Sequence, residues 1–226
     1  MTRITFDGVS HSYGERSVLR DIRLDLSEHR IGVVGANGSG KSTLVRMING
    51  LITPTSGTVS VDGLNVARNA REVRRQVGFI FTNPDNQIVM PTVQEDVAFT
   101  LRRRGLTREQ VAERTAAALD RFGLSAHADH PAHRLSGGQK QLLALAAVLV
   151  AEPKIVVADE PTTLLDARNA RRITELLQEM SQQVIVVTHQ LELLAGFDRV
   201  VVIEEGEVAF DGIPDAALDA YRELLA

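Results

Sequence analysis

Residues 35–42 constrain the fold of this chain more than any other part of its sequence. They read Gly-Ala-Asn-Gly-Ser-Gly-Lys-Ser, which fits the pattern G-x-x-x-x-G-K-[ST], and Thr43 follows them. An apolar run at 31–34 precedes the pattern and predicts a buried strand, and residues 44–49 predict a helix after it. A strand that runs into a glycine-rich loop and then a helix predicts a parallel α/β core.

Strand and helix patterns alternate along the chain, as in a parallel sheet that is covered by helices. Further strands are predicted at 77–81, 155–158 and 184–187, and the last two are almost wholly apolar. Other short runs are typical of antiparallel strands, and Glu205-Gly206 makes the turn between the last two of them: 3–6, 22–26, 58–61, 200–203 and 208–210.

Strand patterns disappear between residues 83 and 134, where helical periodicity takes over. The clearest helices are predicted at 92–103 and 107–122, the second with an apolar stripe formed by Val111, Ala118, Leu119 and Phe122. We therefore expect one domain over 1–226, with an inserted helical subdomain at about 83–134. The apolar run 142–151 is shorter than the roughly 20 residues of a membrane span and predicts a buried helix.

Composition limits the classes of function that fit this chain. A net charge of −4 over 226 residues gives no drive toward nucleic acid, so we expect no nucleic-acid partner. The sequence holds no cysteine, which excludes disulfides and cysteine metal sites and fits a reducing cytoplasm. The first residues show no signal peptide, and we expect a soluble protein.

The glycine-rich loop predicts a nucleotide site. Its backbone N–H groups can converge on phosphate oxygens, and the following helix start favours an anion. Lys41 is expected to reach the β- and γ-phosphates, and the Ser42 hydroxyl to bind Mg²⁺. A glycine turn alone would explain the loop but neither of these two residues. The predicted nucleotide residues are Gly35, Ala36, Asn37, Gly38, Ser39, Gly40, Lys41, Ser42 and Thr43.

Two carboxylates, Asp159 and Glu160, end the apolar strand at 155–158. Ligands of open α/β sheets bind at this edge, so Asp159 is expected to hold Mg²⁺ through water and Glu160 to deprotonate the attacking water. Taken alone, the two residues fit a solvated strand end better; together with the phosphate loop they favour catalysis. His189 follows the strand at 184–187 and could hydrogen-bond the γ-phosphate, although a lone histidine there is more often structural.

Residues 135–139 read Leu-Ser-Gly-Gly-Gln, and with them the sequence resembles the ATP-binding cassette (ABC) ATPases along essentially its whole length. The other matching features, in chain order, are Tyr13 (the aromatic stacked on adenine), the phosphate loop, Asp159-Glu160, Asp166 of the D-loop and His189 of the switch. The resemblance implies a RecA-like P-loop NTPase core with an antiparallel β-subdomain and an inserted helical subdomain. It also implies ATP and Mg²⁺ as cofactors and ATP hydrolysis as the activity.

The signature residues Ser136, Gly137, Gly138 and Gln139 would open a helix at 139–150. Free N–H groups at a helix start suit an anion, and an ordinary N-cap by Ser136 is compatible with that use. In the ABC ATPases this anion is the γ-phosphate of ATP held by the opposite subunit. The resemblance therefore implies a homodimer with two equivalent sites, to which Asp166 also contributes.

A narrower resemblance lies in residues 83–89, Asn-Pro-Asp-Asn-Gln-Ile-Val, and in 92–99 after them. Both resemble the energy-coupling factor (ECF) ATPases, which power vitamin and transition-metal uptake; there, Pro-Asp-x-Gln forms a short helix at the groove for a transmembrane partner. A turn before an acidic helix start explains part of the string. The resemblance implies a transmembrane coupling protein and a substrate-binding membrane protein as partners, at the cytoplasmic face of the inner membrane.

Four residues depart from the ABC pattern. Thr82 stands where Gln is usual, Leu164-Leu165 replaces small residues before the D-loop aspartate, and Lys140 follows the signature. In this family the usual glutamine contacts Mg²⁺ or the attacking water. Here a water molecule or Gln87 would take that role, or hydrolysis is coupled to transport differently. Thr82, the Leu-Leu pair and the short chain most resemble the ATPase of biotin transporters, with cobalt or nickel transport as the alternative.

Two other classes of function fit less well. Non-transport ABC proteins usually carry tandem cassettes or a long coiled-coil insertion, and this sequence shows neither. A module that holds ATP without hydrolysing it is disfavoured by the intact Glu160 and His189.

Overall fold

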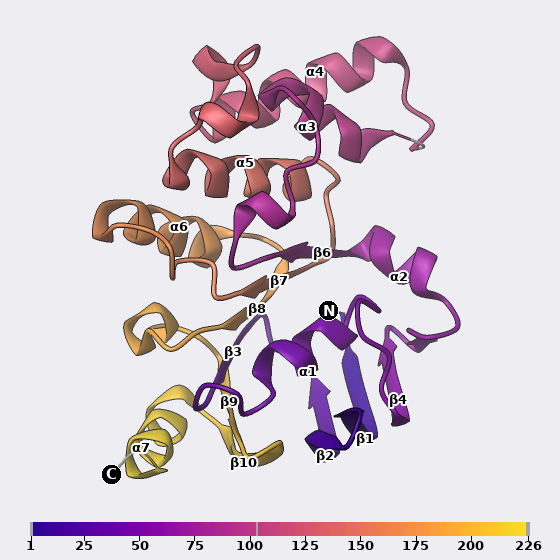
Figure 1. The fold of residues 1–226 in the computed structure, drawn as a ribbon, viewed down its shortest axis with the longest axis vertical. Coiled ribbons are helices and arrows are strands. Elements are labelled where there is room, and N and C mark those ends of the chain that lie inside the picture. The colour runs from indigo at the N-terminus through magenta and orange to yellow at the C-terminus, as the bar shows by residue number, and fades with distance from the viewer. Residues whose placement is uncertain (1, 103, 225–226) are drawn as a thin grey trace. The chain divides into compact units, whose positions relative to one another are not determined.

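The computed structural model describes residues 2–102 and 104–224, which fall into two compact units (Figure 1). The first unit is built from residues up to 77, from 154–160 and from residue 180 onward. The second is built from 78–153 and 161–179, and it contains the predicted helical insert at 83–134. The chain leaves the first unit along strand β6 (Val77–Ile80).

A mostly parallel sheet forms the centre of the first unit. Its strands lie in the order β10-β9-β3-β8-β7: β10 (Glu207–Gly212), β9 (Arg199–Glu204), β3 (Arg30–Val34), β8 (Gln183–Val187) and β7 (Ile155–Asp159). Every residue of β3, β7 and β8 is buried, as their apolar sequences predict. The pair β9–β10 is antiparallel as expected, but β9 also pairs in parallel with β3 and so belongs to this core sheet.

The second sheet of this unit is antiparallel, in the order β2-β1-β4-β5: β2 (Arg16–Leu26), β1 (Ile4–Tyr13), β4 (Ser56–Val61) and β5 (Leu64–Asn65). Strand β1 is much longer than the predicted 3–6. Its register shifts between Phe6 and Val9, so the buried positions change from even to odd numbers. A bulge of this kind hides a strand from a search for alternation.

Among its described residues the first unit also contains the helices α1 (Lys41–Met47), α2 (Ala70–Gln76) and α7 (Pro214–Leu224) and the 3₁₀ turn η4 (Leu191–Leu194). The predicted helix at 44–49 is α1, which begins three residues earlier because the Leu44 amide bonds back to the Gly40 carbonyl. Helix α7 packs on β9 and β10 with Ala217 and Tyr221 buried. The sequence patterns gave no expectation for α2 or α7.

The second unit is helical: α3 (Val93–Leu101), α4 (Arg108–Arg121), α5 (Gly137–Leu149) and α6 (Ala167–Glu179). Three 3₁₀ turns link them: η1 (Pro84–Asn86), η2 (Ser125–His127) and η3 (Ala132–Arg134). Capping boxes start α3 at Thr92 and α4 at Thr107, which fixes both predicted starts. The prediction of 92–103 for the first of these also includes Arg103, which lies outside the described residues.

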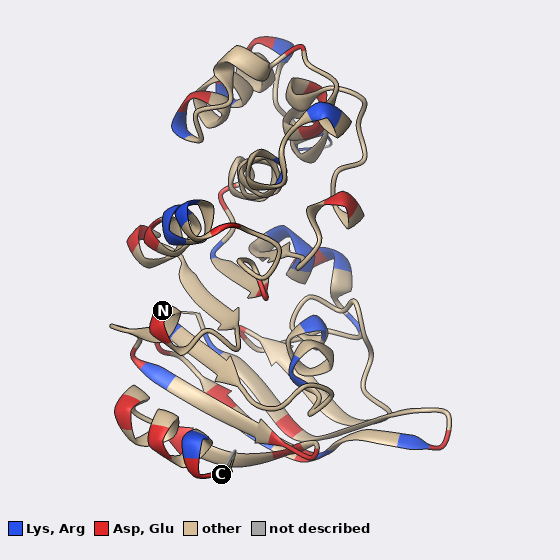
Figure 2. Cartoon of the chain, turned by 60° about the vertical axis from the view of Figure 1, so that its left-hand side comes forward, with Lys and Arg blue, Asp and Glu red and all other residues tan. Residues whose placement is uncertain are grey.

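Burial within these helices follows the apolar patterns. The stripe of α4 buries Leu119, with Phe122 beside it, and Thr115 shares this face, whereas Val111 and Ala118 are half-buried. Helix α5 is buried along most of its length, as its apolar run predicts, and it starts two residues before the predicted 139. Ile173 and Leu177 are the buried residues of α6, whose other faces are charged (Figure 2). No helix in the ranges that the structure describes is long and apolar enough to cross a membrane.

Candidate active site

The glycine-rich loop joins the end of β3 to the start of α1 and has other backbone packed tightly against it. Gly35 and Gly40 have φ angles of 149° and 107°. A Cβ on Gly35 would lie 2.0 Å from the Ile203 carbonyl oxygen of β9, and one on Gly40 would lie 2.7 Å from Cδ2 of Leu19 on β2. Only glycine fits at these two positions, because a side chain would meet both strain and a clash.

The β9–β10 turn holds the loop from one side. The Gly206 amide donates to the Ser39 carbonyl at 3.1 Å, and the Gly206 carbonyl accepts from the Arg20 amide of β2 at 2.8 Å. Sequence patterns located the Glu205-Gly206 turn but gave no signal that it supports the phosphate loop. The contact depends on the tertiary fold, because about 170 residues separate the two segments.

Lys41 is folded back into the loop that it terminates. Its ammonium donates to the Gly35 and Ala36 carbonyls at 2.9 and 2.8 Å, and the residue is only 6% exposed. Burial lowers the pKa of Lys41, and the carboxylates of Glu160, Asp159 and Glu204 oppose that shift. The predicted phosphate ligand is therefore inside the cradle, bound to carbonyls that a phosphate group would replace.

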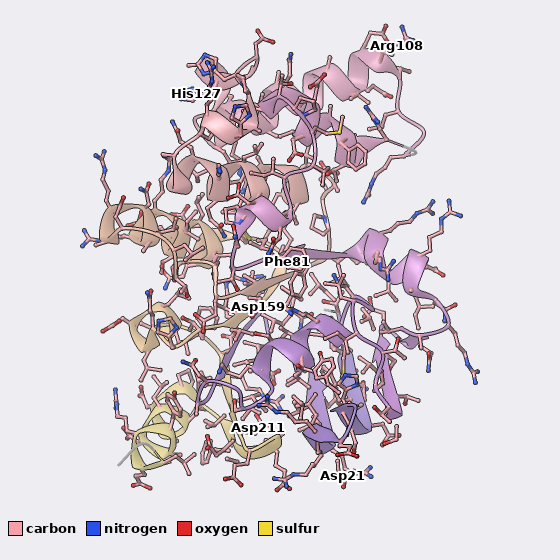
Figure 3. All side chains as sticks on the ribbon, viewed as in Figure 1. Asp21, Phe81, Arg108, His127, Asp159 and Asp211 are labelled. Carbon is pink, nitrogen blue, oxygen red and sulfur yellow. The ribbon has the colours of Figure 1, made fainter. Side chains whose placement is uncertain are left out.

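Asp159, at the end of β7, is the buried charge of the site (Figure 3). Its side chain is 0% exposed and accepts from the Ser42 hydroxyl at 2.7 Å and from the Arg46 guanidinium at 2.9 Å. The neighbouring hydroxyl and carboxylate oxygens are the hard donors that suit Mg²⁺. Ser42 and Asp159, predicted as metal residues from distant parts of the sequence, are thus brought together.

Arg46 is a site residue that the sequence patterns did not indicate. It lies four residues after Ser42 on α1, so the two side chains share one helix face toward Asp159. This spacing was the available signal. A buried carboxylate requires a cationic partner, and Arg46 provides one in this structure.

Glu160 and His189 meet at the carboxyl ends of the adjacent parallel strands β7 and β8. Nδ1 of His189 lies 2.8 Å from Oε2 of Glu160, and the carboxylate can only accept, so Nδ1 carries the proton. Glu160 has a left-handed φ of 54°, and its amide donates to the Val187 carbonyl at 2.9 Å. This uncommon backbone conformation directs the carboxylate toward the histidine, which is a typical feature of functional positions.

Tyr13 ends β1 and is 53% exposed, with its ring edge-on to His11. It pairs across the strand turn with Arg16, whose guanidinium would lie 3.7 Å from a Cβ placed on Gly38. The turn that carries Tyr13 therefore lies beside the phosphate loop. Whether the ring stacks on a base stays a prediction.

The signature residues form the entrance of α5 in the second unit. Ser136 is the N-cap: its hydroxyl accepts from the Gln139 amide at 3.3 Å, and the Gln139 side-chain oxygen accepts from the Ser136 amide at 2.9 Å. The capping interpretation is thus confirmed, and anion binding stays a prediction. Gly138 has no room for a side chain, because a Cβ would lie 2.5 Å from the Asn169 amide carbon.

Asp166 caps α6 next to this entrance. Its carboxylate accepts from the Asn169 backbone amide at 2.9 Å and from the Asn169 side chain at 2.8 Å, and these bonds lower the pKa of Asp166. Because Asn169 also packs against Gly138, the two predicted motifs touch within the second unit. A nucleotide role for Asp166 stays a prediction.

Gln87, which could replace the glutamine missing at position 82, and Lys140, which departs from the ABC pattern, both make specific contacts. The Gln87 side chain accepts from the Phe81 amide at 3.3 Å and donates to the Ala144 carbonyl at 3.1 Å, so both ends of its amide are engaged. Lys140 forms a 2.7 Å ion pair with Asp85, which joins α5 to η1. The exceptional lysine after the signature thus has a partner in the segment that resembles the ECF element.

Comparison with known proteins identifies the class of molecule that this fold and site define. The family model "ABC transporter" matches residues 19–163. The biotin transport ATP-binding protein BioM of Rhizobium etli is 45% identical over 223 residues, which covers 99% of each chain. The energy-coupling factor transporter ATP-binding protein EcfA1 of Ligilactobacillus salivarius is 37% identical, over 98% of this chain and 82% of its own.

A solved structure agrees with these relatives. The cbiO1 protein of Clostridium perfringens, part of the ABC transporter complex cbiONQ, superposes with a TM-score of 0.84 at 31% identity, over 98% of this chain and 92% of its own. The chain therefore belongs to the ABC transporter family, and within it to the ATP-hydrolysing subunits. The predicted ABC ATPase fold and the resemblance to the ECF ATPases are both confirmed.

We predict that Arg46→Met destabilises the nucleotide-free protein by about 2 kcal/mol, because it leaves the buried Asp159 carboxylate without this cation. Urea unfolding monitored by circular dichroism measures the loss. We expect a smaller loss with saturating Mg-ATP, because a Mg²⁺ ion held by Asp159 would provide the opposing charge. The matched control is Arg71→Met at an exposed position of α2. An equal loss of stability with and without Mg-ATP would contradict the expectation that Mg²⁺ can replace Arg46 as the cation beside Asp159.

Proposed function

We propose that this chain is the ATPase subunit that energises uptake of biotin through an ECF-type transporter at the cytoplasmic face of the inner membrane. The main support is the two-part site at the ends of β7 and β8, where Ser42 meets Asp159 and His189 meets Glu160. The similarity to BioM, at 45% identity over 99% of both chains, favours biotin as the transported substrate over cobalt or nickel ions.

ATP binding would use the loop as it is built. The phosphates would lie against the backbone of residues 35–40 and the start of α1, and Lys41 would exchange the Gly35 and Ala36 carbonyls for phosphate oxygens. Ser42 and Asp159 would hold Mg²⁺, which neutralises phosphate charge when bound. Tyr13, on the turn beside the loop, would stack on the base.

Hydrolysis would centre on Glu160. Its carboxylate would take a proton from the attacking water, whose oxygen then forms the new bond to the γ-phosphorus as the bond to the leaving ADP breaks. The hydrogen bond from His189 holds this carboxylate in place, and the histidine would turn to the γ-phosphate when ATP is present. Loss of that phosphate would return His189 to Glu160.

A homodimer would complete each site. The phosphate loop belongs to the first unit and the signature residues belong to the second, and one chain carries both. The entrance of α5 on one subunit would then cover the γ-phosphate held by its partner, with Asp166 at the contact between the subunits.

The surface for the membrane partner would be the docking segment, residues 85–89. Val89 is 64% exposed, and its amide and that of Met90 are held by the buried Asp96 carboxylate at 2.8 and 3.0 Å. Burial raises the pKa of Asp96, and these two amides oppose the shift. The Asp85–Lys140 ion pair ties the same segment to the signature helix α5. Movement of α5 during hydrolysis would therefore reach the partner through this pair.

Transport itself tests the proposal. The chain should co-purify with a transmembrane coupling protein and a substrate-binding membrane protein, and the reconstituted complex should take up labelled biotin only with hydrolysable ATP. Uptake of Co²⁺ or Ni²⁺ in place of biotin would overturn the substrate and leave the ATPase role intact.

We predict that Glu160→Gln keeps ATP affinity, stops turnover and traps a closed dimer, because an amide cannot accept the proton from water. Size-exclusion chromatography with light scattering at saturating Mg-ATP measures the dimer, and phosphate release measures turnover. Glu192→Gln, at an exposed position of η4, is the control and should behave as the parent. Hydrolysis at the parental rate would remove Glu160 from its assigned role.

We predict that Lys140→Met lowers the uptake of substrate per ATP hydrolysed about threefold in the reconstituted transporter, the size expected from losing a partly exposed ion pair. The reason is that the docking segment loses its charged tie to α5. Lys154→Met, which removes an exposed lysine of the first unit, is the control. An unchanged ratio of uptake to hydrolysis would show that the pair does not transmit the movement.

A further inference from the structure

A pair of histidines outside the predicted site is joined to the signature motif through one of its members. His127 and His130 lie in the segment between α4 and α5, and their Nδ1 atoms are 3.0 Å apart (His127 is labelled in Figure 3). The other ring nitrogen of His127, Nε2, lies 3.0 Å from Nε2 of Gln139. The side chain of Gln139 therefore has a partner at each end, since its oxygen accepts from the Ser136 amide.

The direction of every hydrogen bond in this chain of contacts follows from one backbone donor. The Ser136 N–H can only donate, so the Gln139 oxygen faces it and the Gln139 NH₂ faces His127. His127 must then accept at Nε2, so its proton is on Nδ1 and is donated to Nδ1 of His130. The remaining proton of His130 is on its Nε2.

We propose that His127 is a positioning residue for the signature glutamine, and that His130 fixes the tautomer of His127 in which it can act. The pair holds the Gln139 amide with its oxygen toward the start of α5. The Ser136–Gln139 capping box, and with it the arrangement of free N–H groups at the helix entrance, then depends on two imidazoles that the ABC pattern does not contain.

Both imidazoles must be neutral for this series of hydrogen bonds to form. A proton added to His127 would occupy Nε2 and place a donor against the Gln139 NH₂ group. A proton added to His130 would occupy Nδ1 and face the N–H of His127, and moving that hydrogen to Nε2 of His127 only returns the conflict to Gln139. This set of hydrogen bonds therefore has no place for an extra proton.

The charged groups on the neighbouring elements are mostly engaged elsewhere. On α3, Glu95 is in the capping box of Thr92 and Asp96 holds the docking segment, and Lys140 on α5 is paired with Asp85. Between the two histidines, Asp129 accepts from Gln94 at 2.6 Å. Further charged or titratable groups on these elements are Arg108, Glu109, Glu113, Arg114, Asp120 and Arg121 on α4 and His133 and Arg134 in η3.

The tautomers can be observed directly. Long-range ¹H–¹⁵N correlation spectra of the full-length nucleotide-free protein at pH 7.5 should show His127 protonated at Nδ1 and His130 protonated at Nε2. The uncommon Nδ1 tautomer at His127 is the specific expectation. An Nε2-protonated or charged His127 at this pH would overturn the inference. This readout is independent of catalysis, so it fails or succeeds separately from the proposed function.

Variants test the consequence for ATP, which rests on the proposed function. His127→Leu should raise the ATP concentration for half-maximal hydrolysis about fivefold at pH 7.5, the effect of about one lost hydrogen bond. His127→Gln can still accept a hydrogen bond from Gln139, so it should restore the parental value. His133→Gln, at an exposed position six residues away, is the matched control and should follow the parent.

Rescue by the glutamine variant separates positioning from a general structural role, because both variants remove the imidazole and only His127→Gln can still accept a hydrogen bond. Equal half-maximal ATP concentrations for His127→Leu and His127→Gln would overturn the inference. If the histidine tautomers were as expected but Glu160→Gln did not trap a dimer, the proposed function would be wrong and the positioning role of His127 would still be supported.

Discussion

The buried carboxylate of Asp159 is the interaction on which the site depends. A charge with no exposure to water is stable only among partners, and here one face of α1 supplies the Ser42 hydroxyl and the Arg46 guanidinium. These bonds hold the start of α1 against the end of β7. Since α1 begins where the phosphate loop ends, the same contacts also fix the loop. The same contacts therefore fix the position of the phosphate loop and balance the charge of Asp159 before any nucleotide binds.

The second unit shows a similar principle with neutral groups. The entrance of α5 is held by hydrogen bonds among a backbone amide, a glutamine and two histidines. The donor and the acceptor of each bond follow from the backbone N–H of Ser136, which can only donate. A neighbouring ion pair connects α5 to the docking segment. The helix that would contact ATP in the dimer is thus linked, within its own unit, to the surface that would contact the membrane partner.

Sequence reasoning worked best where the physical signal was local. The strands at 155–158 and 184–187 are fully buried, and each of their residues is apolar. Capping boxes at Thr92 and Thr107 set helix starts that periodicity alone would leave uncertain. It located only the start of β1, because the register shift after Phe6 moves the buried side chains from even to odd positions. It did not predict α2, in which Val73 is the buried residue.

The sequence by itself determined which carboxylates follow a buried strand and which serine caps the signature helix, and it predicted the residues of the phosphate loop. These follow from short motifs whose meaning needs only neighbours along the chain. The tertiary structure decided which distant groups stand together: Arg46 beside Asp159, the Gly206 turn on Ser39, His189 on Glu160 and His127 on Gln139. No local pattern predicts such pairs, because their distances are set by strand order and helix packing.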